Sequence, residues 1–305
     1  MKMLITGATG FLGLNLVNHY KSKDFELSLL DKHPDLFDFE KQLLWNKIKP
    51  LIDIKIHTYY YDLTEEAHHT KHLLKNVDTV VHLANVARIE PSWKQYEHYY
   101  NTNITATQQF FQLCQEAGVK RFVYVSSSSV YGNNGQSVQT EDGPLCPTNP
   151  YAVSKMAAEW ALRVQSQRGN TELIIVRPFT MYGSFMDNGD NALVIAKFLK
   201  ARSKGEPLTI HGDGTQSRDF LHADDAVQGL SLIIEHGKPN EIYNLGSGTT
   251  TRIKDLANMI DSKHVLVPHR TGPVQITHAN IDKLKLLGYN PIHNIQDWII
   301  SQIDH

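Results

Sequence analysis

Three glycines lie between the first predicted strand of the chain and its first predicted helix. Gly7, Gly10 and Gly13 follow a β-rich run at residues 2–6 and open a helical pattern at residues 11–21. Glycine allows a tight turn and lets a ligand approach the backbone closely. A pyrophosphate at this turn would lie at a helix N-terminus, where the peptide dipoles favour negative charge. The spacing GxxGxxG in this position therefore predicts a dinucleotide-binding α/β fold.

Strand and helix patterns alternate through the first half of the sequence. This alternation implies right-handed crossovers and a Rossmann-type, doubly wound parallel sheet with helices on both faces. Further strands are predicted at residues 26–30, 55–60, 79–83, 122–126 and 172–176, and further helices at residues 65–74, 96–117 and 151–167.

The pattern changes after residue 178. Elements become shorter and glycine and proline more frequent, which predicts a smaller C-terminal α/β lobe that binds the substrate. We expect a dinucleotide-binding domain at residues 1–178 and a substrate lobe at residues 179–305. A helical segment in the region of residues 217–236 is expected to return to the first domain.

Charge and cysteine content restrict the classes of partner. Lys plus Arg number 30 and Asp plus Glu number 32, whereas binding to a phosphate backbone needs a basic excess. No apolar run approaches the roughly 18 residues of a membrane span, and the N-terminus shows no secretory signal. Cys114 and Cys146 lack metal-ligand spacing, and His68, His69 and His72 fit a solvated face. We therefore expect a cytoplasmic protein without nucleic acid, membrane or metal partners.

Asp31 predicts which dinucleotide binds. It follows the second predicted strand, 18 residues after Gly13. A carboxylate there accepts hydrogen bonds from the ribose of NAD and repels the 2′-phosphate of NADP. The adjacent Lys32 would weaken that preference, and a local cap or turn is the alternative role for Asp31. Other cofactor contacts are expected at the helix start and at the ends of the third and fourth strands, from Phe11, Leu12, Asp62, Leu63, Leu83 and Ala84.

Tyr151 and Lys155 are the candidate catalytic pair. They lie four residues apart and so share one face of a predicted helix. A tyrosine with its ordinary pKa near 10 is a poor base at neutral pH, but a neighbouring cation and the positive nicotinamide ring favour the phenolate. Four serines, residues 126–129, lie at the end of an earlier strand. Together with the glycine loop, this combination indicates an NAD-dependent enzyme. His82 is interpreted as a packed core histidine rather than a catalyst.

These motifs resemble those of the extended short-chain dehydrogenase/reductases, specifically the NAD-dependent nucleotide-sugar epimerase/dehydratase family, over almost the whole sequence. The resemblance implies that Ser127 shares the reacting proton with Tyr151, with Ser126 and Ser128 as alternative positions. It implies a nucleotide-diphosphate sugar as substrate, with Arg218 on the diphosphate. The implied cofactor contacts are Asn103, Tyr151, Lys155 and Pro178, and the implied substrate contacts are Arg88, Ser127, Ser128, Thr180, Arg218 and Arg270.

The resemblance also implies oxidation of the sugar at carbon 4, which leaves several reactions open. A 4-epimerase returns the hydride to the opposite face and regenerates NAD in place. A 4-keto-sugar reductase more often uses NADPH, which Asp31 disfavours. Dehydratases of this kind carry Asp and Glu where this chain has Ser128 and Ser129. We therefore expect a 4-epimerase, with a reductase, then a dehydratase, then a non-enzymatic NAD sensor as alternatives. The family further implies a homodimer, formed through the helices at residues 96–117 and 151–167.

Overall fold

Seven parallel strands form the central sheet of the protein. The computed structural model describes residues 1–20, 23, 25–32, 56–65, 67–186, 193–261, 263–268 and 274–303. In this part of the chain the strand order is β11-β6-β5-β4-β1-β2-β3. The winding reverses between β1 and β4, which confirms the predicted Rossmann-type sheet. The strand bounds are β1 Lys2–Thr6, β2 Glu26–Asp31, β3 Ile56–Tyr60, β4 Thr79–His82, β5 Arg121–Val125, β6 Glu172–Pro178 and β11 Ile242–Leu245.

The strands are apolar along most of their length because both faces of the sheet are buried. Met3 and Ile5 of β1 pack into one buried cluster, whereas Leu4 packs into another. In β5, Val123 and Tyr124 divide between the same two clusters. Successive side chains of a strand point to opposite faces. A parallel sheet covered on both sides therefore appears in the sequence as continuous apolar runs.

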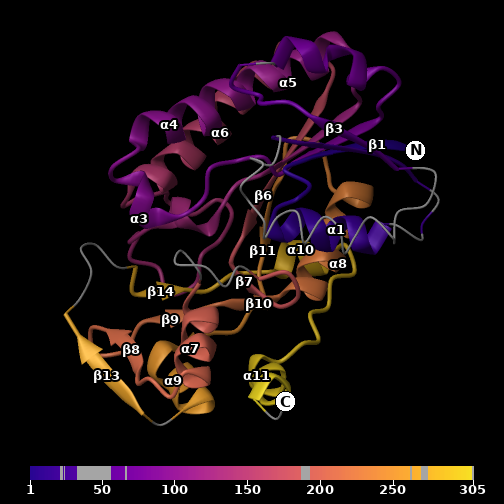
Figure 1. Ribbon diagram of the computed structural model, residues 1–305. Coiled ribbons are helices and arrows are strands. Elements are labelled where there is room, and N and C mark those ends of the chain that lie inside the picture. The colour runs from indigo at the N-terminus through magenta and orange to yellow at the C-terminus, as the bar shows by residue number, and fades with distance from the viewer. Residues whose placement is uncertain are drawn as a thin grey trace.

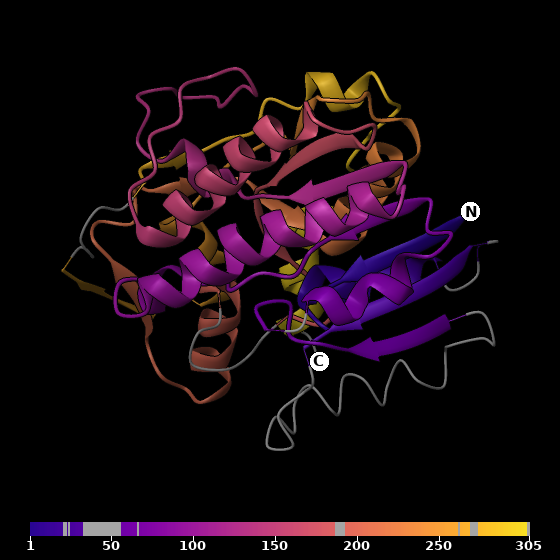
Figure 2. The ribbon, with the colours of Figure 1, turned by 90° about the horizontal axis from the view of Figure 1, so that it is seen from above.

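Helices cover both faces of the sheet (Figure 1), and α5 and α6 run side by side across one of them (Figure 2). The two buried clusters of the sheet include side chains from these helices. On one face lie α1 (Phe11–Tyr20), α8 (Ala223–His236) and α10 (Asp282–Lys285); on the other lie α4 (Tyr96–Tyr100), α5 (Thr107–Glu116) and α6 (Pro150–Ser166).

Two of the predicted helices form, but they include turns that are not α-helical. The stretch predicted at residues 96–117 contains the π-helical segment η3 (Asn101–Ala106) between α4 and α5. π-Helical turns are frequent at functional sites, and this one carries Asn103. The stretch predicted at residues 65–74 is the 3-10 helix η2 (Ala67–Leu74). There the Thr70 hydroxyl donates to the Ala67 carbonyl at 2.6 Å, a local bond that favours a tight turn.

A second lobe is built from short strands and from helices α7, α9 and α11. The third buried cluster of the protein lies in this lobe and joins Phe198 of α7, Leu256 of α9 and Ile299 of α11. The strands form the pairs β10-β7 and β13-β8 and the trio β12-β9-β14. The bounds are β7 Thr180–Tyr182, α7 Val194–Ser203, β8 Leu208–His211, β9 Ser217–Arg218, β10 Phe220–His222, β12 Thr251–Arg252, α9 Ile253–Ile260, β13 His264–Val267, β14 Ile276–Thr277 and α11 Ile295–Ile303.

The chain returns from the second lobe to the central sheet. Helix α8 packs against α1, where the hydroxyls of Tyr20 and Ser231 share a hydrogen bond of 2.8 Å. Strand β11, which follows the segment expected to return, also belongs to the central sheet. It pairs with β6, and Tyr243 lies opposite Val176. Within the described ranges, no helix combines the length and the apolar character needed to cross a membrane.

Candidate active site

A cleft runs along the carboxyl ends of the central strands and is closed on its other side by the second lobe. Parallel α/β sheets bind ligands at this edge, next to the point where the strand order reverses. Arg270 lies outside the described residues, and Asn103 and Lys155 are buried behind the cleft wall. The other predicted site residues all line the cleft, namely Gly7, Gly10, Phe11, Leu12, Gly13, Asp31, Asp62, Leu63, Leu83, Ala84, Arg88, Ser127, Ser128, Tyr151, Pro178, Thr180 and Arg218.

The glycine loop leaves no room for side chains. Gly7 has a positive φ of 67°, and a Cβ atom there would lie 2.6 Å from the backbone nitrogen of Ala84. A Cβ atom on Gly13 would lie 2.5 Å from the carbonyl oxygen of Gly7. The loop therefore packs directly on the end of β4 and on the start of α1. This is the close backbone approach that a pyrophosphate at the α1 N-terminus requires, and the loop fits a dinucleotide.

Asp31 both fixes the glycine loop and faces the cleft. Its Oδ2 atom accepts hydrogen bonds from the backbone and the hydroxyl of Thr9, each at 2.7 Å. The neighbouring Lys32 points elsewhere, because its Nζ lies 2.9 Å from Oδ2 of Asp62. The cation that could attract a 2′-phosphate is therefore held by another carboxylate. This arrangement favours NAD over NADP. Asp31 both accepts hydrogen bonds from Thr9 in the turn, the local role that was the predicted alternative, and lines the cleft where a ribose would bind.

Behind the cleft, His82 is a structural residue. Its Nδ1 lies 2.9 Å from the Thr6 hydroxyl and its Nε2 lies 3.1 Å from the Thr107 hydroxyl. The ring stacks against both Phe110 and Phe122. Burial lowers the pKa of His82 to about 3, so the ring stays neutral at physiological pH. This geometry agrees with the interpretation of His82 as a core histidine.

Asn103 supports the cleft wall from behind. Its Oδ1 accepts from the Val86 nitrogen at 2.8 Å, and its Nδ2 donates to the Val86 carbonyl at 3.0 Å and to the Ser154 hydroxyl at 2.9 Å. These three bonds use both ends of the carboxamide. Asn103 thereby holds the segment after β4 against α6, and its predicted contact with the cofactor stays a prediction.

The start of α6 brings Tyr151 to the cleft. Asn149 caps the helix, its Oδ1 accepting from the Ala152 nitrogen at 2.9 Å, and Pro150 occupies the first turn. Such caps fix where a helix begins. Ser127, which follows β5, lines the same cleft, and its side chain lowers the pKa of the Tyr151 phenol. The predicted base and its predicted hydroxyl partner therefore lie in one cleft, and the assignment of Ser127 as the catalytic serine stays a prediction.

Besides the predicted Lys155, a second cation, Arg88, influences the Tyr151 phenol. Burial raises the pKa of the Tyr151 phenol, while the hydrogen bond to Ser127 and the charge of Arg88 lower it. Lys155 instead donates to the Val125 carbonyl at 2.7 Å and lies 4.5 Å from the centre of the Tyr124 ring. Burial lowers the pKa of Lys155 to about 7. The predicted effect of Lys155 and of the nicotinamide ring on the phenolate stays a prediction.

Sequence reasoning missed a buried polar network under α6. Glu159 and Arg177 form an ion pair, with Nη2 of Arg177 2.6 Å from Oε2 of Glu159, and both side chains are almost completely buried. Ser126 also donates to Glu159, and Arg177 donates to the Tyr131 hydroxyl at 2.9 Å. Glu159 lies one helical turn after Lys155 and raises the pKa of that ammonium against the effect of burial. In the sequence, the signal for this contact was the four-residue spacing of Lys155 and Glu159, which places both side chains on one face of a helix.

Arg218 brings positive charge to the opposite wall of the cleft. Its Nη1 donates to the carbonyls of Ser217 at 2.7 Å and Gln275 at 3.3 Å. Burial lowers the pKa of the guanidinium to about 10. Among its described contacts the acceptors are carbonyl oxygens, which do not neutralise a buried charge. An anionic group of a ligand would supply the missing compensation, in agreement with the predicted diphosphate contact.

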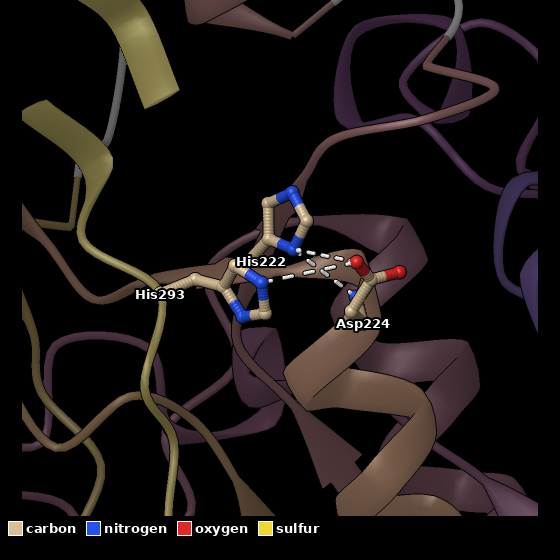
Figure 3. A group of neighbouring side chains, drawn as sticks. All are labelled: His222, Asp224 and His293. Atoms are coloured by element: carbon tan, nitrogen blue, oxygen red, sulfur yellow. Dashed lines mark hydrogen bonds and ion pairs between the residues drawn. The ribbon is translucent and has the colours of Figure 1, made fainter. Parts of the chain in front are cut away.

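A cluster outside this cleft joins His222 and Asp224 at the start of α8 to His293 before α11 (Figure 3). One Asp224 oxygen lies 3.7 Å from Nδ1 of His222 and 3.8 Å from Nε2 of His293. The two rings are stacked, with centres 4.2 Å and planes 22° apart. A metal ion must lie in the plane of each imidazole that binds it, and stacked planes do not meet at one ion. Nδ1 of His293 pairs instead with the buried Asp225 at 2.9 Å. The cluster therefore anchors the C-terminal segment to α8.

Residues 3–246 match the NAD dependent epimerase/dehydratase family. The chain belongs to this family. Membership confirms the predicted resemblance, the assignment as an enzyme and NAD as the cofactor.

Relatives of this family member share its full length. An uncharacterized UDP-glucose epimerase, YtcB, of Bacillus subtilis is 32% identical over 317 residues, covering 99% of this chain and 97% of the relative. The UDP-glucuronic acid 4-epimerase of Bacillus cereus, solved with UDP-glucuronic acid and NAD, is 28% identical with a TM-score of 0.88, covering 100% and 98% of the two chains. The dTDP-glucose 4,6-dehydratase DesIV of Streptomyces venezuelae, solved with NAD, is 25% identical with a TM-score of 0.89, covering 100% and 96%.

Proposed function

We propose that this family member is an NAD-dependent nucleotide-sugar 4-epimerase that works through a 4-keto intermediate. The observation that carries the proposal is that Tyr151 and Ser127 lie in one cleft with the glycine loop and Arg218. The UDP-glucuronic acid 4-epimerase of B. cereus supports the same reaction. The relative YtcB, an uncharacterized UDP-glucose epimerase, supports the same reaction class.

The cofactor-facing part of the cleft divides into four regions. The glycine loop would hold the pyrophosphate, Asp31 the adenosine ribose, and the ends of β4 and β6 the nicotinamide half. Asp62 and Leu63 would border the adenine. NAD, when bound, supplies the acceptor and donor for the hydrogen on carbon 4 of the sugar. The residues of this proposed cofactor site are Gly7, Gly10, Phe11, Leu12, Gly13, Asp31, Asp62, Leu63, Leu83, Ala84, Tyr151, Lys155 and Pro178.

The proton chemistry is assigned to the residues at the α6 start. The Tyr151 phenolate takes the proton of the carbon-4 hydroxyl, and Ser127 is the neighbouring hydroxyl that shares it, while the carbon-bound hydrogen leaves with its electron pair. After the keto sugar has turned over in the cleft, Tyr151 returns the proton and the hydrogen returns to the opposite face. Oxidation and reduction cancel, so no external reductant is needed. Lys155 binds the nearby backbone behind the site.

The wall beside Tyr151 argues against dehydration. Ser128 and Ser129 line the cleft at the end of β5, and hydroxyls there cannot carry the protons that loss of water across carbons 5 and 6 requires at neutral pH. Among the described lining residues, the carboxylates are Asp31 and Asp62, at the adenosine end, and Glu90. A 4-keto-sugar reductase remains the second candidate, since it uses the same Tyr151 and differs only in exchanging the reduced cofactor.

A panel of UDP-, GDP- and dTDP-sugars, incubated with the purified enzyme and followed by NMR, tests this proposal. We expect the enzyme to interconvert carbon-4 epimers with NAD as its cofactor, either retained from purification or added, and without NADH in the assay. A Tyr151→Phe variant should bind NAD as tightly as the wild type and lose at least 10²-fold in rate. Stoichiometric consumption of added NADH with a 4-keto sugar would replace the epimerase by a reductase, and a 4-keto-6-deoxy product would replace it by a dehydratase.

We also propose that the enzyme is a cytoplasmic homodimer. On α6, Trp160 and Val164 are 54% and 64% exposed, an apolar pair that a second copy of the helix would cover. Cys114 and Cys146 are free thiols, as expected in a reducing compartment. Light scattering should give twice the chain mass of 34.6 kDa, and Trp160→Glu with Val164→Glu should give a monomer. A monomeric wild type would refute the assembly.

The division of labour between the lobes forms part of this proposal. The central sheet with residues 1–178, α8 and β11 holds NAD, and the remainder after residue 178 holds the nucleotide sugar. Thr180 on β7, Ser128, Arg88 and Arg218 are the proposed substrate contacts from the described residues. Arg270 is retained as a proposed second diphosphate ligand.

A further inference from the structure

Glu159 and Arg177 form a buried ion pair beneath the wall of the cleft. Besides the 2.6 Å bond between Nη2 of Arg177 and Oε2 of Glu159, Nε of Arg177 donates to Oε1 at 3.0 Å. A guanidinium and a carboxylate joined by two bonds have a defined relative orientation. A buried ion pair nevertheless stabilises a fold little compared with apolar residues of similar volume. The pair therefore needs a role besides stability.

Glu159 holds the first residue of a segment that we call the serine segment, residues 126–131. The Ser126 hydroxyl is buried and donates to Oε1 of Glu159. The preceding residue, Val125, accepts a hydrogen bond from Lys155 of the same helix. Two consecutive residues at the end of β5 are thus bound by two side chains that lie one turn apart on α6.

Arg177 holds the last residue of the serine segment, which ends with the 3-10 helix η4 (Ser128–Tyr131). Nη1 of Arg177 donates to the Tyr131 hydroxyl at 2.9 Å, and the guanidinium lies 4.9 Å from the centre of the Tyr131 ring. The same hydroxyl donates to Oδ1 of Asn244 at 2.7 Å. The two members of one ion pair therefore bind the two ends of the serine segment.

The middle of the serine segment faces the reacting group. Ser127 and Ser128 line the cleft together with Tyr151, and the Ser127 side chain lowers the pKa of the Tyr151 phenol. Tyr151 lies two turns before Glu159 in α6. The ion pair thus connects the helix that carries the proposed base to the segment that carries its proposed partner. Catalytic groups must lie within about 0.5 Å of their productive geometry, and such a connection can supply that precision.

We propose that the Glu159–Arg177 pair positions the serine segment against Tyr151, so that Ser127 can share the proton of the sugar hydroxyl. Glu159 acts through the first residue of the segment and Arg177 through the last, so both are positioning residues. Neither is among the described residues that line the cleft. This inference rests on the proposed function and adds two residues to its machinery. Charged hydrogen bonds suit the task because they are directional, whereas apolar contacts are not.

Replacement of both charges by Met tests the assignment, because the double variant leaves no unpaired charge in the interior. Glu159→Met with Arg177→Met should fold with a Tm near that of the wild type. We expect kcat for epimerisation to fall by about tenfold or more, because small displacements of reacting groups are costly. The Kd values for NAD and for UDP should stay within about threefold of the wild type, since the pair lies outside both proposed binding regions.

Arg121→Met with Glu172→Met is the matched control. Arg121 begins β5 and Glu172 begins β6, and their side chains form an ion pair of 2.8 Å. This pair joins the same two strands at the ends that lie away from the serine segment. Its loss should leave kcat unchanged.

Ser126→Ala and Tyr131→Phe each release one end of the serine segment and leave the ion pair in place. Each should lower kcat with little change in the Kd for UDP. An unchanged kcat in both single variants would overturn the assignment, and this outcome decides the matter even where the double Met variant does not fold.

Hydrogen–deuterium exchange of the purified protein examines the serine segment without any reaction. Its backbone amides should exchange faster in Ser126→Ala, Tyr131→Phe and Glu159→Met with Arg177→Met than in the wild type and the control. Equal exchange in all of these proteins would overturn the positioning role. A wild type that leaves every carbon-4 epimer unchanged would refute the proposed function, whereas the exchange contrast would still support the positioning of the segment.

Discussion

The ammonium group of Lys155 donates a hydrogen bond of 2.7 Å to the carbonyl oxygen of Val125. Val125 ends β5, two residues before Ser127, and Lys155 lies one helical turn after Tyr151 in α6. One buried bond therefore ties the helix that carries the base to the strand that carries its partner. The Tyr124 ring, 4.5 Å from Nζ, covers the same ammonium. The position of Tyr151 against Ser127 depends on this contact.

Replacement of Lys155 by Met is expected to reduce turnover by at least 10²-fold without unfolding the protein. The pKa of Lys155 falls from 10.5 to about 7 on burial. Between these values the unfolded chain binds a proton that the folded chain does not, so wild-type stability should rise with pH from about 7 upward. Urea titrations of the cofactor-free protein should show this rise in the wild type and a smaller one in Lys155→Met. Equal pH dependence in both proteins would contradict the prediction.

His82 should make the protein sensitive to acid. Its pKa is lowered by burial from 6.5 to about 3, so below pH 6.5 the unfolded chain takes up a proton that the folded chain refuses. Stability is lost as the pH falls, by up to about 1.4 kcal/mol per pH unit from this residue. His82→Asn should show a correspondingly shallower slope between pH 6.5 and 4.5 in urea denaturation. Parallel slopes would show that His82 is protonated in the fold.

Asp31→Asn should weaken NAD binding by about tenfold, since hydrogen bonds from the ribose to a charged acceptor are each worth about 1.5–3 kcal/mol and are only partly replaced by an amide. The carbonyl oxygen of Asn can still accept from Thr9, so the loop should keep its fold. Asp62→Asn is the informative companion, because it releases Lys32 and should raise affinity for NADP. Fluorescence titration with both dinucleotides measures the two effects. Unchanged NAD affinity in Asp31→Asn would remove Asp31 from the cofactor site.

Arg218→Gln should raise the Kd for a nucleotide-diphosphate sugar by about 10²-fold and leave the Kd for NAD unchanged, because charged pairs in buried sites contribute about 2–5 kcal/mol. Arg252 of β12 lies opposite Ser217, the neighbour of Arg218 on β9, and its side chain is exposed. Arg252→Gln therefore serves as the control and should have little effect on either Kd. Binding of free UDP should show the same contrast. A loss restricted to NAD would assign Arg218 to the cofactor instead.

His293→Ala should destabilise the protein by about 1–3 kcal/mol, because the buried Asp225 loses a side-chain hydrogen-bond donor. The exposed His236 provides a control, and His236→Ala should change the free energy of unfolding by less than about 0.5 kcal/mol. Chemical denaturation measures both. A stabilisation of wild type but not of His293→Ala by added zinc would instead show that the stacked histidines bind metal after rearrangement.

The sequence alone determined the features that depend on neighbours along the chain. A glycine loop between strand and helix, an aspartate at the end of β2, and a tyrosine one turn before a lysine are local patterns, and each lies where it was expected. The doubly wound sheet was predictable for the same reason: apolar runs and helical periods report local burial. The serine run was local too, but four adjacent hydroxyls could not show which one meets Tyr151.

Tertiary structure decided the features that depend on distance through space. β11 is a strand of only four residues, so its place beside β6 follows from pairing with a segment far away in the chain. Glu159 and Arg177 are charged residues that are almost completely buried, and their contact with each other and with the hydroxyls of Ser126 and Tyr131 makes that burial tolerable. Arg88 and Tyr151 are 63 positions apart, yet the charge of one acts on the phenol of the other. Local patterns specify where elements form, whereas electrostatic coupling depends on burial and separation, which exist only after the elements have packed.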